Sequence, residues 1–185
     1  MPTPLTFFAG TPIFTTNLVV LISHGLNCND PMKLSRRSDY ALRALFSLAD
    51  RYRQGPLSIR ELAEHNDIPR RFLEQIMLDL KGKGWVRSLA GRDGGFELAV
   101  SPEELTMGQV VRLFDGVLSP IGCVSVTDYE ACTQESHCRF RRVLLEIRNF
   151  TSHLMEKATL ARVMRGEPVR RDEVFQAAFI AGDGI

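Results

Sequence analysis

Three of the chain's four cysteines lie within sixteen residues. Cys123, Cys132 and Cys138 stand in the stretch GCVSVTDYEACTQESHC, at the spacing C-x8-C-x5-C. Four cysteines in 185 residues are too few for a secreted scaffold held together by disulfides. Clustered cysteines more often serve metal or redox chemistry. Three thiolates suit an iron–sulfur cluster, and a weaker fourth ligand would leave one iron with a labile position.

Two other roles for the cysteines stay open. Structural zinc usually takes four ligands that include two cysteines only a few residues apart, and neither interval here is that short. Alternatively, two of the thiols form a disulfide on oxidation. Arg139, Arg141 and Arg142 lie close to Cys138 in the sequence, and such positive charges favour the reactive thiolate.

An enzyme with a cysteine nucleophile is a further alternative. It would pair Cys138 with His137, His153 or His65 as the base. Side chains adjacent in a chain rarely face each other, and no glycine-rich oxyanion loop accompanies these residues. We therefore predict that the chain is not an enzyme.

The elements before the cysteines follow the order of a winged helix–turn–helix. Apolar residues at steps of four, three and four predict a helix over 38–53. Ser58, with Glu61 three residues later, predicts a capping box that opens a short helix through His65. Pro69 suits the first position of the next helix, so two short helices are separated by a tight turn.

A hairpin and two further helices follow. The sequence ArgAspGlyGly at 92–95, between two short apolar runs, predicts a β-hairpin. Thr106 can cap a helix through Phe114. From Cys138 to Met164, apolar residues at helical steps predict one helix of roughly 39 Å, at about 1.5 Å per residue. Its apolar stripe needs a second surface, which the same helix of another subunit would supply.

This element order is typical of DNA binding, because a helix fits the major groove and a hairpin beside it reaches the backbone. The residues predicted to contact double-stranded DNA are Lys33, Ser58, Arg70, Arg71, Glu74, Gln75 and Arg92. Residues 32–98 also carry 13 Lys and Arg against 9 Asp and Glu, which favours a polyanionic partner. The alternatives are a solvated helix face, or a winged helix that binds another protein.

The first 31 residues differ from the rest of the chain. They contain no Lys or Arg, and Asp30 is their only charged residue. The apolar run NLVVLI is too short to span a membrane, and no basic segment precedes it as in a secretory signal. We expect a non-domain extension, disordered or upstream of the true start, on a cytoplasmic protein that does not enter a membrane.

Taken in order, these segments resemble the Rrf2 family of bacterial transcription regulators. The resemblance covers about residues 32–163 and is carried by MKLSRRSDYALRALFSLA, SIRELAEHNDIPRRFLEQIMLDLKGKGWV, GRDGGFELA, LTMGQVVRLFDG and the cysteines. It implies a homodimer that binds palindromic operators, with a winged helix–turn–helix and a long dimerisation helix in each subunit. It also implies a [2Fe–2S] or [4Fe–4S] cluster, through which operator affinity would respond to iron, redox state or nitric oxide.

The resemblance assigns three metal ligands to the loop before the long helix. These ligands are Cys123, Cys132 and Cys138. Their second interval matches the family's pattern, while the first is longer. A histidine that serves as fourth ligand in one branch is replaced here by Arg141. Asp39 matches the carboxylate that completes the site from the partner subunit in another branch, and His137 is a local alternative.

The sequence thus predicts a mainly α-helical fold with a small β-hairpin, divided into five parts. They are an extension at 1–31, the winged helix–turn–helix at 32–116, the cysteine loop at 117–138, the dimerisation helix at 139–165 and a tail at 166–185.

Overall fold

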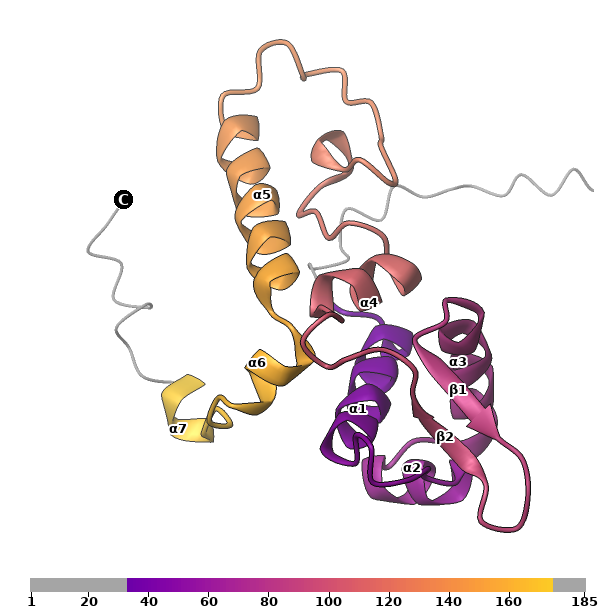
Figure 1. Cartoon of the computed structure of the whole chain (residues 1–185). Helices are drawn as coiled ribbons and strands as arrows, with labels where there is room; N and C mark the ends of the chain where they lie inside the picture. Colours follow the sequence, from indigo (N-terminus) through magenta and orange to yellow (C-terminus); the bar gives the residue numbers. More distant parts are fainter. Residues whose placement is uncertain (1–32, 175–185) are drawn as a thin grey trace, which may run out of the picture.

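The computed structural model describes residues 33–174 (Figure 1). The predicted extension at 1–31, with Cys28, and the last part of the predicted tail lie outside the described residues. The elements in chain order are α1 (Arg36–Asp50), α2 (Ile59–Asn66), α3 (Arg70–Gly82), β1 (Val86–Leu89), β2 (Gly95–Leu98), α4 (Met107–Phe114), the 3₁₀ turn η1 (Gly122–Val124), α5 (Arg141–Lys157), α6 (Leu160–Met164) and α7 (Arg171–Val174). The prediction of a mainly helical fold with one hairpin is confirmed. No helix between residues 33 and 174 is long and apolar enough to cross a membrane.

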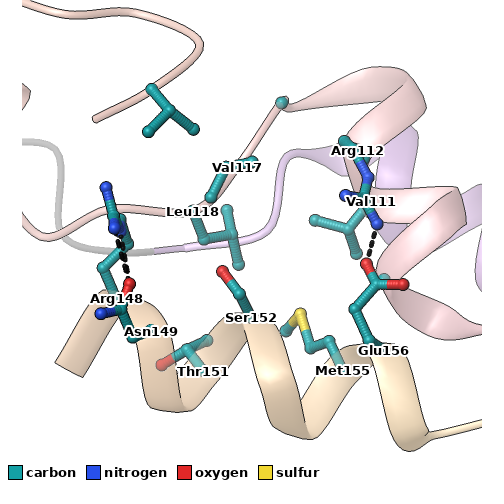
Figure 2. A pocket seen from close by; sticks show the side chains of 13 residues that line it. Val111, Arg112, Val117, Leu118, Arg148, Asn149, Thr151, Ser152, Met155 and Glu156 are labelled. Carbon is teal, nitrogen blue, oxygen red and sulfur yellow. Dashed lines mark hydrogen bonds and ion pairs between the residues drawn. The ribbon is translucent and has the colours of Figure 1, made fainter. Parts of the chain in front are cut away.

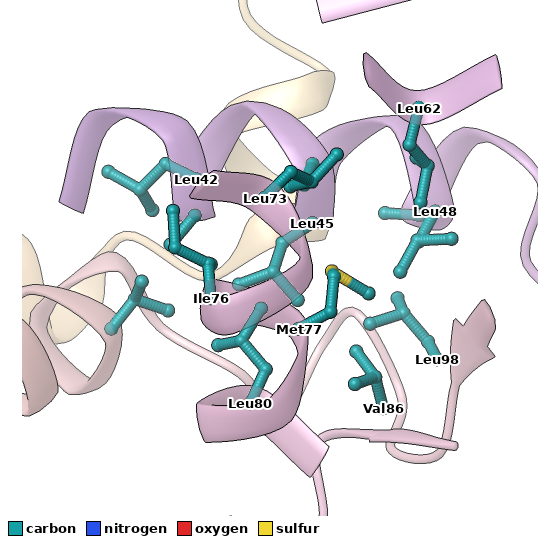
Figure 3. Packing of buried hydrophobic residues seen from close by; sticks show 14 of the residues in the cluster. Leu42, Leu45, Leu48, Leu62, Leu73, Ile76, Met77, Leu80, Val86 and Leu98 are labelled. Carbon is teal, nitrogen blue, oxygen red and sulfur yellow. The ribbon is translucent and has the colours of Figure 1, made fainter. Parts of the chain in front are cut away.

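The hydrophobic core is built around α1, which contacts α2, α3, α4, α6 and β2. Leu45 of α1 and Leu73 and Ile76 of α3 are fully buried, and Val86 and Leu98 of the hairpin close the cluster (Figure 3). Burying one such side chain is worth about 1.5–3 kcal/mol. The helix–turn–helix and the wing are therefore parts of one packed unit.

The predicted helix starts at Ser58 and Thr106 are confirmed by side-chain capping, whereas Pro69, expected at the first position of α3, is its N-cap. The Ser58 hydroxyl accepts a hydrogen bond from the Glu61 N–H, and the Glu61 carboxylate accepts one from the Ser58 N–H. Thr106 and Gln109 form the same reciprocal pair at the start of α4. Asp67 ends α2 in the left-handed region, at φ 52°, which turns the chain tightly into α3.

The wing is an antiparallel hairpin that pairs Val86 with Leu98 at its base. Its second strand also bonds to the segment before α2, because Leu57 and Phe96 exchange backbone hydrogen bonds of 2.9 and 2.8 Å. A Cβ atom on Gly95 would lie 2.3 Å from the Leu57 carbonyl oxygen. Only glycine permits this close approach, which fixes the wing to the helix–turn–helix.

The prediction of one continuous helix from Cys138 to Met164 was wrong, because the chain turns at Ala158. Ala158 has φ −86° and ψ 79°, and its carbonyl accepts a hydrogen bond from the Met107 N–H at 2.8 Å. The Leu160 N–H then donates to the Leu105 carbonyl at 2.9 Å, and the Leu160 side chain is fully buried. The apolar pattern continues across the turn because α6 packs back on α1.

Candidate nucleic-acid interface and cysteine loop

One face of α3 is exposed while the opposite face holds the helix in the core. The buried face consists of Leu73, Ile76, Met77 and Leu80. The exposed face consists of Arg70, Arg71, Glu74, Gln75 and Leu78. These positions recur one and four residues apart, so they form a continuous strip along the helix. The structure brings together the four residues of α3 that the sequence predicted as DNA contacts.

The charges on this strip are not equivalent. Arg70 Nε lies 3.0 Å from Glu74 Oε1, which offsets the repulsion between an exposed carboxylate and a phosphate backbone. Arg71 forms no ion pair with any residue in 33–174. Within the exposed strip, Arg71 is thus a cation whose charge is not offset by a neighbouring carboxylate of the described residues.

The other predicted DNA contacts lie outside α3, on three separate segments. Ser58 caps α2 through its hydroxyl oxygen, which leaves its O–H to donate. Lys33 precedes α1 and Arg92 lies in the hairpin loop, and both side chains are exposed. Figure 1 shows the hairpin loop projecting from the domain at the end away from α5.

Two features of this surface were missed from the sequence. Leu78, 59% exposed, continues the strip of α3 one turn beyond Glu74 and adds an apolar side chain to it. Counting four residues on from Glu74 would have found it. Arg37 fixes the position of α3, because its Nη2 lies 2.6 Å from Asp79 Oδ2 and its guanidinium lies over the Phe114 ring. An ion pair between residues so far apart in sequence has no local signature.

The three cysteines of the loop have different environments. Cys123 is buried in η1, Cys138 is half-buried and Cys132 is exposed, and all three are free thiols. Within the part of the chain that the structure describes, no three His, Cys, Asp or Glu side chains are grouped so that they could hold a metal ion. The donor types therefore fit a cluster, while this conformation of the loop does not gather them.

The candidates for a fourth ligand are engaged elsewhere. Asp39 accepts hydrogen bonds from Arg43 at 3.0 Å and pairs with it at 2.8 Å, one turn along α1. The Nδ1 atom of His137 lies 2.7 Å from the Ser136 hydroxyl oxygen. Neither side chain belongs to a group of described residues that could hold a metal ion with the cysteines.

A set of polar contacts, which we call the loop clasp, joins Tyr129, Glu135 and Arg141. The Tyr129 hydroxyl donates to Glu135 Oε1 at 2.6 Å, and the Cys132 N–H donates to the same oxygen at 3.3 Å. Arg141 lies 3.5 Å from the other carboxylate oxygen. Arg141 also donates from Nη2 and Nε to the Cys123 carbonyl at 2.7 and 3.2 Å. Glu135 and Arg141 therefore connect the segments of Cys123 and Cys132 to α5.

The loop clasp shifts the pKa values of Glu135 and Tyr129 in opposite directions. The hydrogen bond from Tyr129 lowers the pKa of Glu135, and the Cys132 N–H and the Arg141 charge act in the same direction. The same hydrogen bond raises the pKa of Tyr129, with burial and the Glu135 charge adding to the shift. The clasp is thus strongest when Glu135 is ionised and Tyr129 is neutral.

A second arginine of α5 anchors the same segment. Arg148 Nη1 donates to the Val124 carbonyl at 2.7 Å. Arg141 and Arg148 are seven residues apart, so they lie on one side of the helix and hold two consecutive carbonyls of η1. The loop is fixed to α5 mainly by hydrogen bonds to its backbone.

The outer face of α5 carries an apolar stripe with no partner in the described chain. Its members are Val143, Ile147, Phe150 and Leu154, which are between 40% and 69% exposed. No residue of α5 is buried. Such a stripe on a helix of a soluble domain marks an interaction surface.

The arrangement of α2, the turn, α3 and the hairpin defines a winged helix–turn–helix DNA-binding protein. The chain belongs to the Rrf2 family: the model of that family, described as iron-dependent transcriptional regulator, matches residues 34–166. The family predicted from the sequence is thus confirmed, and the protein is a DNA-binding transcription regulator of this family.

Known proteins similar to this chain share the fold over most of its length. An Rrf2-like HTH-type transcriptional regulator of Rhodobacter capsulatus is 38% identical over 128 residues, which are 66% of this chain and 84% of the relative. The structure of CymR, the global cysteine regulator of Bacillus subtilis, matches with TM-score 0.61 at 27% identity, over 71% of this chain and 95% of that one. The oxidised form of Staphylococcus aureus CymR matches with TM-score 0.60 at 28% identity, over 74% and 99%.

Proposed function

We propose that this protein is a cytoplasmic, homodimeric transcription regulator whose affinity for a palindromic operator is controlled by an iron–sulfur cluster on its cysteine loop. The observation that carries the proposal is the position of three free thiols on one loop. That loop directly follows the DNA-binding head, the winged helix–turn–helix and α4 at 36–114, and Arg141 joins it to α5. The description of the family as iron-dependent supports it.

The apolar stripe of α5 supports the proposed homodimer. A helix with no buried residue and four large apolar side chains on one face is most simply covered by its symmetry copy. Two-fold symmetry would present two α3 helices to two half-sites of a palindrome. The winged helix–turn–helix would then act as a DNA-binding head, the cysteine loop as a sensing loop and α5 as the dimer helix.

The cluster would be held by Cys123, Cys132 and Cys138, with Asp39 of the partner subunit as the candidate fourth ligand. Bound there, it would supply redox-active iron that responds to iron supply, oxidants or nitric oxide. Because the three thiols are not gathered in this conformation, filling the site requires the loop to move. Arg141 and Arg148 would carry that movement from the carbonyls of Cys123 and Val124 to α5.

The test compares wild type with Cys132→Ala, both purified without air and then treated with or without iron and sulfide. We expect a coloured wild-type protein with stoichiometric iron and sulfide, whose affinity for a selected operator duplex changes on reconstitution. Cys132→Ala should bind DNA alike in both preparations. If the reconstituted wild-type protein holds iron but its operator affinity is unchanged, the cluster does not control DNA binding. The assignment as a DNA-binding protein would still stand.

A thiol switch is a second candidate, supported by the exposure of the Cys132 thiol, which a peroxide can reach, and by the likeness to an oxidised CymR. In this case two thiols would lose two protons and two electrons to a peroxide and form a disulfide. Mass spectrometry after peroxide treatment should then show a loop disulfide in a colourless protein. Operator affinity should change with the peroxide in wild type and stay constant in Cys132→Ala.

A further inference from the structure

A pocket of about 220 Å³ lies between α4, the segment 116–118 and α5 (Figure 2). No cysteine and no residue of α3 lines it, although Val117, Leu118 and Val126 belong to the cysteine loop. Its lining includes Val111, Leu118, Arg148, Ser152, Met155 and Glu156. Pockets for drug-sized ligands measure about 300–1,000 Å³, so this one suits a small metabolite.

The pocket has an unbalanced positive charge at one end. At the other end Arg112 and Glu156 form an ion pair and neutralise each other (Figure 2). Half-buried Arg148 has no carboxylate within ion-pair distance in the described chain, and its charge meets only the neutral oxygens of Val124 and Asn149. An uncompensated guanidinium in a partly enclosed site favours an anion.

The middle of the pocket combines an apolar wall with one unused hydroxyl donor. Val111, Leu118 and Met155 form the wall. The hydroxyl of Ser152 points toward the space (Figure 2) and has no side-chain hydrogen-bond partner among the described residues. The pocket can therefore bind a ligand that has one polar end and an apolar body.

The pocket does not compete with the apolar stripe of α5. At 100° per residue, the direction of the pocket residues Arg148, Ser152 and Met155 lies about 140° around the helix from that of the stripe. A second subunit on the stripe would therefore leave this side of α5 facing its own α4.

We propose that this pocket binds a small aliphatic monocarboxylate as a second effector of the regulator. The carboxylate would accept hydrogen bonds from the free N–H groups of Arg148 and from Ser152, and the chain would lie against Val111, Leu118 and Met155. Binding itself is independent of the proposed function; its regulatory effect rests on that function. The ligand would join α4, which packs on α1, to the arginine that holds η1.

The binding test uses 4-methylpentanoate as probe on the full-length ¹⁵N-labelled protein without DNA. We expect amide signals of α4, 116–118 and α5 to shift saturably. The neutral probe 4-methylpentanamide should leave them in place. Arg148→Gln should weaken binding about tenfold or more, the effect expected for losing a charged hydrogen bond.

Two further variants separate binding from loop disruption. Ser152→Leu fills the pocket while keeping Arg148, and it should abolish the shifts. Arg142→Gln removes an exposed arginine of α5 outside the pocket and should change nothing. Absence of shifts at the solubility limit, or equal binding by Arg148→Gln and Arg142→Gln, would overturn the site. The operator affinity with and without the probe is measured by fluorescence anisotropy. If the probe binds but this affinity does not change, the binding site is confirmed and its role as an effector site is refuted.

Discussion

The DNA-binding head at 36–114 and the region of the cysteine loop and α5 are stabilised in different ways. The head contains most of the buried apolar side chains, gathered in one cluster around α1. In α5 no residue is buried. The loop before it buries only Cys123, Val124 and Ser125. The head is therefore stable through its own packing, while α5 depends on what covers it.

The difference matters for signalling. Segments with few buried apolar contacts and exposed hydrogen bonds open at low free-energy cost. The cysteine loop is of this kind, since Arg141 and Arg148 hold it through backbone carbonyls and Glu135 through exposed polar contacts. A chemical event on the cysteines can thus change the loop without unfolding the head.

The largest effect that tests this comparison is on stability. Leu45→Ala, in the centre of the head, should lower the free energy of unfolding by about 3 kcal/mol, because it leaves a cavity in a packed core. Denaturant titration followed by circular dichroism measures the change. The loss should be the same at every protein concentration.

Leu154→Ala on the stripe of α5 is the matched substitution. It should weaken subunit association, so its effect on stability should grow as the protein is diluted. Analytical ultracentrifugation should show a raised dissociation constant. A concentration-independent loss as large as that of Leu45→Ala would mean that α5 is buried within its own subunit.

DNA affinity is the next effect in size. Arg71→Ala should weaken operator binding by about 1–3 kcal/mol, because Arg71 has no intramolecular ion pair to give up. Fluorescence anisotropy at several salt concentrations tells its role: a phosphate contact lowers the salt slope by about one, while a base contact alters sequence preference. Arg165→Ala, whose side chain pairs with Glu103 far from α3, should leave both unchanged.

The head could be predicted from the sequence because its signals are local. The capping box at Ser58 and Glu61, the glycines of the hairpin and the cap at Thr106 each act within a few residues. The regular spacing of apolar residues then indicated which face of each helix packs into the core. The four predicted contacts on α3 share one face because helix geometry alone places them there.

The loop and the end of the long helix could not be predicted in this way. The turn at Ala158 depends on hydrogen bonds to Met107 and Leu105, about fifty residues earlier in the chain, and an apolar pattern does not record them. In the sequence, Arg141 is noticed only because it stands where one branch of the family has a histidine ligand. Its contacts with Cys123 and Glu135 are visible only in the structure.

A smaller effect concerns the loop clasp. Glu135→Gln keeps the shape of the side chain but removes its negative charge. That charge attracts Arg141 and strengthens the hydrogen bond that Glu135 accepts from the Cys132 N–H. We expect alkylation of Cys132 by iodoacetamide to become severalfold faster, measured by mass spectrometry at neutral pH. Glu146→Gln on α5, an exposed acid outside the clasp, should not change the rate; equal rates in both variants would show that the clasp does not restrain the loop.

The smallest effect is the pH dependence of the clasp. The folded-state pKa of Glu135 is lowered, so its stabilising contribution is complete above the ordinary carboxyl range and is lost as pH falls through the lowered pKa. The pKa of Tyr129 is raised, so its contribution persists below the ordinary tyrosine range and is lost as pH rises through the raised pKa.

Glu135→Gln should therefore move the pKa of Tyr129 down toward its ordinary value. Ultraviolet absorbance of tyrosinate follows this titration, and Tyr129→Phe identifies the signal among the three tyrosines. A Tyr129 titration that does not respond to Glu135→Gln would mean that their hydrogen bond does not persist in solution, and that Arg141 and Arg148 tie the loop to α5 without it.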